Sequence, residues 1–184
     1  MRISCQSVLT EQNKFSLVDL PMQFTQLDFH IQKCTEHLDA TKTHNTEVES
    51  YFVQYLLTRI CAEYETRIAI LIQRRCSRMT DLHVKRFLQR SAKEVARNFN
   101  LGDLKGVLGR FGDDYKQIFH DSVMNTPAHV AWDNIYNNRQ AVAHSSGAQM
   151  SFGDLKQNYQ QSLLVLDALV SALCLKPKET KDLT

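Results

Sequence analysis

The chain is poor in the residues that interrupt regular structure, with six glycines and three prolines among 184 residues. Long secondary-structure elements are therefore expected. No apolar run reaches 18 residues, which excludes an ordinary membrane-spanning helix. The first residues also lack the apolar core of a secretory signal peptide. These absences predict a cytoplasmic protein without a membrane partner. The length of 184 residues predicts one domain with an adequate core.

Closely spaced cysteines are also missing. The five cysteines are spread over the chain, with no Cys-x-x-Cys pair among them, at Cys5, Cys34, Cys61, Cys76 and Cys174. Disulfide frameworks and structural zinc sites depend on closer or regular spacing. We therefore expect buried, reduced thiols.

The motifs that bind common cofactors and metals are lacking too. The sequence contains no glycine-rich phosphate loop, no dinucleotide-binding fingerprint, no nucleophile elbow and no zinc spacing. His30, His37 and His44 are seven residues apart, whereas two metal ligands on one helix face are three or four apart. No cofactor and no metal are expected.

Apolar residues are plentiful, and they recur every three or four positions along most of the chain, which is typical of amphipathic helices. The pattern predicts an all-α protein, an antiparallel helical bundle of about four long helices plus short helices. We expect residues 1–20 to form an arm, 21–176 the domain and 177–184 a tail. The expected helices cover 22–41, 46–77, 81–98, short pieces between 101 and 119, 127–144, and a last helix from Ser151 that ends before Pro177.

Several helix boundaries and faces can be predicted. Thr46 with Glu49, and Ser151 with Asp154, have the spacing of helix-capping pairs. Thr126-Pro127 is a start signal for the helix 127–144. In the helix 81–98, the residues predicted to face inward are Val84, Leu88, Ala92, Val95 and Phe99.

Positive charge is concentrated in residues 59–97, which hold ten Lys/Arg and four Asp/Glu. Such a stretch attracts phosphate groups, although it is also typical of the solvated face of long helices. If the stretch binds RNA, the residues expected to do so are Arg74, Arg75, Arg78, Lys85, Arg86 and Arg90.

The strongest candidate for chemistry lies late in the chain, where Arg139 precedes His144 by five positions. An arginine can hold a phosphate with two hydrogen bonds, and a histidine can move protons near neutral pH. Together they could cleave RNA without a metal by using its 2′-hydroxyl as nucleophile. The amides predicted to support them are Asn134, Asn137, Asn138 and Gln140. On an ideal helix Arg139 and His144 are about 140° apart, so one copy of the chain offers an incomplete site.

This Arg-x4-His run, with a polar residue after the arginine and a small-residue turn after the histidine, resembles the signature of the HEPN superfamily, close to its RiboL-PSP-type branch. The resemblance implies a homodimer whose site lies at the two-fold interface, with Arg139 and His144 as catalytic residues. It also implies an acid on the long second helix that supports Arg139, and Glu63 and Glu65 are equally suitable. Family members often carry Asn, Asp or His where this chain has Gln140. Ser146 replaces the tyrosine of the nucleotidyltransferase-associated branch.

The function expected from the resemblance is metal-independent endoribonuclease activity, as a toxin or anti-phage defence effector that cleaves RNA and has an antitoxin protein as possible partner. The alternative is a non-catalytic HEPN-like module that binds a partner protein or a nucleotide. A generic helical adaptor with a chance motif is a third interpretation.

Overall fold

A computed structural model describes residues 24–77, 80–95, 99–144 and 147–174, with the side chains of 92–95 left out. The predicted arm 1–20, the tail 177–184, Cys5, Arg78 and the inward positions Ala92 and Val95 therefore fall outside the described residues or side chains. No strand occurs in the described ranges, and the expected all-α class is confirmed. The helices are α1 (Thr25–Thr41), α2 (Glu47–Cys76), α3 (Leu82–Val95), α4 (Leu101–Gly109), α5 (Asp113–Met124), α6 (Ala128–Ala143) and α7 (Phe152–Leu173).

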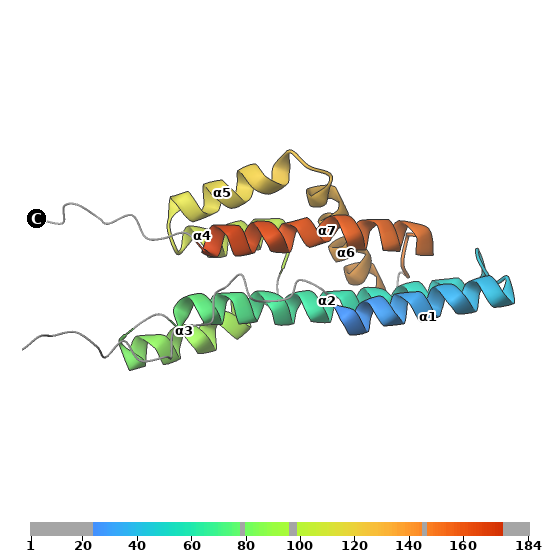
Figure 1. Ribbon diagram of the computed structural model, residues 1–184, viewed down its shortest axis with the longest axis horizontal. Helices are drawn as coiled ribbons and strands as arrows, with labels where there is room; N and C mark the ends of the chain where they lie inside the picture. The colour runs from blue at the N-terminus through green and yellow to red at the C-terminus, as the bar shows by residue number, and fades with distance from the viewer. Residues whose placement is uncertain (1–23, 78–79, 96–98, 145–146, 175–184) are drawn as a thin grey trace, which may run out of the picture.

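Helix α2 is the spine of the bundle (Figure 1). It packs against α1 over its N-terminal half and against α3 over its C-terminal half. Helix α7 lies along its other side and contacts α2, α5 and α6. Helix α6 also contacts α2, so the predicted packing of the helix 127–144 on the helix 46–77 is confirmed. Helix α6 is thereby held between α2 and α7.

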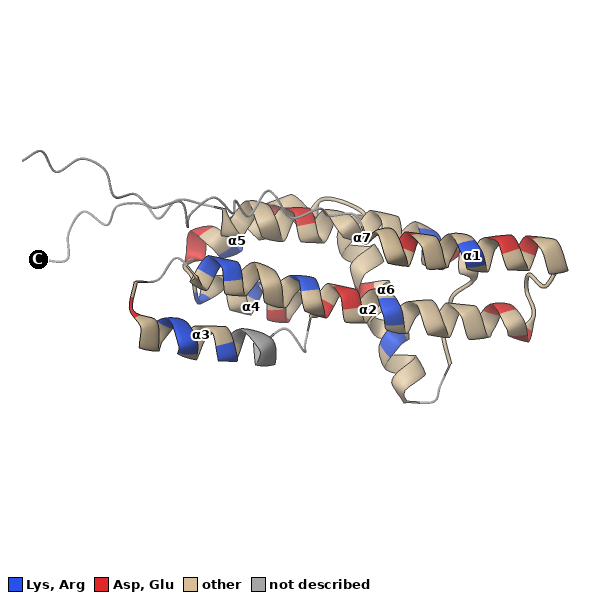
Figure 2. Cartoon of the chain, turned by 60° about the horizontal axis from the view of Figure 1, so that its bottom comes forward, with Lys and Arg blue, Asp and Glu red and all other residues tan. Residues whose placement is uncertain are grey.

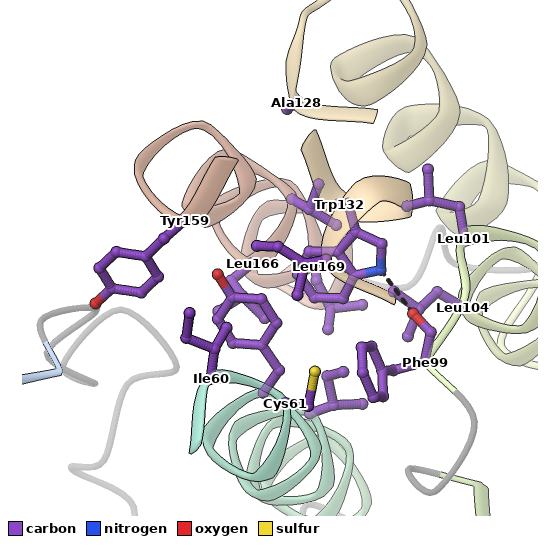
Figure 3. Close-up of a cluster of buried hydrophobic side chains, with 14 of the residues drawn as sticks. Ile60, Cys61, Phe99, Leu101, Leu104, Ala128, Trp132, Tyr159, Leu166 and Leu169 are labelled. Atoms are coloured by element: carbon purple, nitrogen blue, oxygen red, sulfur yellow. Dashed lines mark hydrogen bonds between the residues drawn. The ribbon is translucent and has the colours of Figure 1, made fainter. Parts of the chain in front are cut away.

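The core is centred where α2, α6 and α7 meet (Figure 3). The Trp132 ring stacks on Tyr64, with centroids 4.7 Å apart and planes inclined by 4°. The Trp132 indole donates a 2.7 Å hydrogen bond to the carbonyl of Phe99. The Tyr64 and Ser162 hydroxyls are 2.5 Å apart. Each polar atom buried here has a partner, as the cost of burial requires.

The two predicted capping pairs have different outcomes. Ser151 and Asp154 form the predicted capping box at the start of α7. Thr46 occupies the N-cap of α2, but its hydroxyl donates to the carbonyl of Thr43 instead of capping the helix. Glu49 accepts hydrogen bonds from the backbone of Asn45 and of Phe152. The prediction of a Thr46–Glu49 capping box is therefore wrong, because Glu49 links two helix starts instead.

The face of α3 also differs from the prediction. Phe99 is buried and Leu88 is half-buried, as expected, but Val84 is 39 % exposed. Phe87, which the pattern did not place inward, is 68 % exposed. Helix α3 packs mainly on one neighbour, α2. A single neighbour covers only part of a wide apolar face, and the rest remains in solvent.

Cys34, Cys61 and Cys76 are buried free thiols, as expected, whereas Cys174 is only half-buried. Burial raises the pKa of the Cys61 thiol to about 12, so this thiol stays protonated and unreactive at neutral pH. Within the described ranges, no helix has both the length and the apolar character that crossing a membrane requires.

Candidate functional site at the end of helix α6

Arg139 lies near the C-terminus of α6 and reaches toward α2. Its Nη2 atom is 3.8 Å from Oε1 of Glu65, and its Nη1 donates a weak 3.5 Å hydrogen bond to the Gln140 side chain. The Arg139 side chain is 36 % exposed and that of Glu65 is 30 % exposed. A long, part-exposed ion pair of this kind contributes little to stability. The guanidinium is therefore restrained but accessible.

The structure distinguishes the two acids that were equally suitable in the sequence. Glu65 is paired with Arg139 across helices, whereas Glu63 is 3.4 Å from Arg59, one turn earlier on α2. Two residues apart on a helix, their side chains diverge by about 200°. Only Glu65 is therefore directed to α6, and it is half-buried rather than buried.

His144 directly follows the last residue of α6 and forms its C-cap. Its backbone N–H donates a 3.0 Å hydrogen bond to the carbonyl of Gln140, and its side chain is exposed. The described part of the chain offers the imidazole no hydrogen bond or ion pair, and none joins it to Arg139. The ring is therefore available to a ligand or to another molecule.

The supporting amides separate into two groups. Asn134 donates to Asn158 of α7 at 3.2 Å. Asn138 donates to the carbonyl of Asn134 at 2.9 Å and accepts from the backbone N–H of Gln149 at 2.6 Å. These two asparagines attach α6 to α7 and to the segment that connects them, so they position the helix end.

The other two amides lie closer to the candidate chemistry. Gln140 is half-buried, contacts Arg139 through its side chain and holds His144 through its carbonyl. Asn137 is exposed. Together with His144, these residues form a polar edge along the last turns of α6.

The basic residues at the C-terminal end of α2 and on α3 lie on a different part of the molecule from α6 (Figure 2). The Arg75 guanidinium donates to the Tyr115 hydroxyl and lies 5.3 Å from the centre of the Tyr115 ring. Arg75 is therefore already in contact with another residue of the fold. Arg74 has one buried guanidinium nitrogen, and Lys85 is half-buried. Arg86 and Arg90 are exposed and line a groove with Gln73 and Gln89, two residues that the sequence did not single out.

No cluster of three or more His, Cys, Asp or Glu side chains in the described ranges is arranged to hold a metal ion. No model of a known protein family matches the chain, and no match was found among curated proteins or solved structures. The likeness to the HEPN superfamily therefore rests on the stretch around Arg139 and His144.

Proposed function

We propose that this protein is a metal-independent endoribonuclease of the HEPN type, acting as a toxin or anti-phage defence effector. One observation carries the proposal: the end of α6 presents an accessible guanidinium and an exposed, unpartnered imidazole. Both are groups that RNA cleavage needs, and neither is occupied by a strong contact within the fold. Asn134 and Asn138 of the same helix, by contrast, are used to hold it in place.

In the proposed reaction His144 accepts the proton of a ribose 2′-hydroxyl. The 2′-oxygen then forms a bond to the adjacent phosphorus, and the bond from phosphorus to the 5′-oxygen breaks. A general acid returns a proton to that leaving oxygen. The products are a 2′,3′-cyclic phosphate and a 5′-hydroxyl, so every proton and bond is accounted for.

Arg139 would stabilise the negative charge that grows on the phosphoryl oxygens in the transition state. Its planar fork can hold two of these oxygens at once. Glu65 would hold the side chain near the site while no RNA is bound, and a phosphate would compete for it readily because the ion pair is long.

A homodimer would complete the site. One protomer supplies one imidazole, whereas the reaction needs both a base and an acid. A two-fold axis beside the end of α6 would bring two copies of His144 and of Arg139 around one phosphate, because a symmetric interface repeats every contact. The second histidine would then act as the acid.

Cleavage of a mixed RNA substrate in EDTA tests the proposal. We expect His144→Ala and Arg139→Ala each to lower the cleavage rate by about a hundredfold or more, since a general base or a transition-state contact is lost. Arg139→Lys should fail equally, because an ammonium cannot make the bidentate contact. All three variants should unfold at the wild-type temperature.

Matched controls are available in the same fold. Arg59→Ala removes an arginine of similar exposure, 38 %, from a similar pair with Glu63. His37→Ala removes an exposed histidine of α1. Both should retain wild-type cleavage. Strict dependence on Mg²⁺, or full activity of the His144 variant, would refute the mechanism.

A second candidate function is a non-catalytic HEPN-like module that binds a nucleotide or a partner protein. It is favoured by the absence of an Arg139–His144 contact in the described protomer and by Gln140 in place of the residues usual in the family. RNA that binds but is never cleaved by any preparation of the wild type would support this alternative.

A further inference from the structure

The groove between α2 and α3 has an unusual lining for a surface depression. It has a volume of about 390 Å³ and is lined by Gln73, Arg86, Gln89 and Arg90. No carboxylate and no apolar side chain is among these residues. Each of the four can donate hydrogen bonds, and the two glutamines can also accept them. The lining matches a ligand with anionic groups and additional polar edges.

Arg86 and Arg90 are one helical turn apart on α3. Like charges at this spacing oppose each other and slightly destabilise a helix. Two other charged residues near this pair, Asp81 and Arg75, form hydrogen bonds within the fold. Asp81, which directly precedes α3, accepts hydrogen bonds from the backbone of His83 and Val84, and the Arg75 guanidinium donates to the Tyr115 hydroxyl. Among the described side chains, none forms an ion pair with Arg86 or Arg90, and both arginines are exposed to an anionic ligand.

An aromatic ring projects beside this pair. Phe87 follows Arg86, precedes Arg90 by one turn, and is 68 % exposed, the highest exposure among the large apolar side chains of the described residues. An exposed ring next to guanidinium groups is the combination by which proteins hold single-stranded nucleic acids, with bases stacked on the ring and phosphates on the cations.

We propose that this groove binds a single-stranded nucleic acid, with Arg86 and Arg90 on successive phosphates and Phe87 stacked on a base. The Gln73 and Gln89 amides would contact base or sugar groups. The inference rests on the proposed function in one respect, since it takes the strand to be the RNA substrate. The groove does not include Arg139 or His144, so it captures the strand and takes no part in the bond-breaking step.

The lining favours a nucleic acid over a protein partner. Two of the four described residues lining this groove are arginines one turn apart, and a nucleic acid offers such a pair a regular row of phosphates, one for each nucleotide. It favours a single strand over a duplex because the bases of a duplex are stacked on each other and leave none for Phe87.

The test uses a labelled single-stranded DNA oligonucleotide, which lacks the 2′-hydroxyl and cannot be cleaved by the proposed reaction. Fluorescence anisotropy with the full chain gives its affinity at several salt concentrations. In the double variant Arg86→Gln, Arg90→Gln, the slope of log affinity against log salt should fall by about 1.4, for two lost phosphate contacts. Phe87→Leu should weaken binding about fivefold or more and leave the slope unchanged.

The control double variant Lys33→Gln, Lys156→Gln removes the same charge from α1 and α7 and should bind as the wild type. An unchanged salt slope in the arginine variant, or an equal loss in the control, would overturn the inference. Failures of the two proposals are distinguishable. If RNA is cleaved but neither binding nor cleavage depends on Arg86 and Arg90, only the proposal for the groove is refuted. If the oligonucleotide binds through these arginines but no RNA is cleaved, only the proposed endoribonuclease activity is refuted.

Discussion

Glu49 is a buried carboxylate, 7 % exposed, that holds together segments far apart in the chain. It accepts hydrogen bonds from the backbone N–H groups of Phe152 at 2.8 Å and Asn45 at 2.7 Å. These bonds, in that order of importance, hold the pKa of Glu49 below its ordinary value. His44 is 3.4 Å away and lowers it further. The start of α7 is therefore attached to the α1–α2 connection by one negative charge.

We predict that this charge makes stability depend on acid. A carboxyl with a lowered folded-state pKa stabilises the protein above the unfolded-state pKa of about 4.3, and the contribution is lost as the pH falls through the folded-state value. Glu49→Gln should lower the unfolding free energy at pH 7 by about 1–3 kcal/mol. It should also flatten the decline of stability below about pH 4.3. Denaturant titrations between pH 7 and pH 3 measure both effects.

Glu47→Gln is the matched control, since Glu47 is an exposed acid one half-turn earlier that accepts from the Tyr51 hydroxyl. Its pH profile should follow the wild type. If the unfolding free energy of Glu49→Gln depended on pH as that of the wild type does, the pKa of Glu49 would be the same in the folded and the unfolded protein, contrary to the prediction.

At the scale of the elements, the orientation of the end of α6 depends on Asn138. Its side chain joins the carbonyl of Asn134 to the backbone of Gln149 beyond the helix. We predict that Asn138→Ala lowers the unfolding free energy by about 1 kcal/mol, because two hydrogen bonds are lost. Asn137→Ala, on the exposed side of the same helix, should change it by less than about 0.5 kcal/mol. Thermal unfolding of the two variants compares them, and equal effects would contradict the positioning role.

The helices that could be predicted from the sequence are those whose signals are local. The helix predicted at 22–41 from its apolar spacing and the Ser151–Asp154 box of α7 depend only on neighbouring residues, and both are present. Thr46 and Glu49 have the same local pattern, but Phe152, more than a hundred residues later, attracts the Glu49 carboxylate. Glu49 therefore accepts from the distant Phe152 backbone and does not form the local capping bond with Thr46. Local sequence patterns cannot indicate such a tertiary contact.

The candidate site was predictable to a similar extent. Arg139 and His144 lie on one helix end and could be found from their spacing. The partner of Arg139 could not, because the choice between Glu63 and Glu65 depends on how α2 is rotated relative to α6. The groove on α3 was missed in part for the same reason. Gln73 joins Arg86 and Arg90 only through the packing of α3 on α2.

For the whole molecule, the proposed dimer has a consequence that mixing can test. If two protomers share one site, His144→Ala and Arg139→Ala are each inactive as homodimers. A mixed dimer retains one arginine and one histidine at the shared site, so it keeps the base and one phosphate contact but lacks the second histidine as acid, and water must protonate the leaving oxygen. We predict that mixing the two inactive proteins restores part of the wild-type RNA cleavage, above that of either protein alone, after time for subunits to exchange.

The control mixture combines His144→Ala with the double variant His144→Ala, Arg139→Ala, which supplies no histidine and should stay inactive. Light scattering on the wild type should give twice the mass of the chain. A monomer at all concentrations, or a mixture with no regained activity, would exclude a site shared across a two-fold axis.

The chain has one tryptophan, Trp132 of α6, and its side chain is fully buried against α2. Its indole is stacked on Tyr64 and bonded to the backbone at Phe99. The fluorescence of Trp132 therefore reports whether α6 is packed against α2. Emission should be that of an apolar environment and shift to longer wavelength when α6 detaches. Ligands that bind at the far end of α6 can thus be screened, without any attached dye, for whether they loosen the helix or leave it in place.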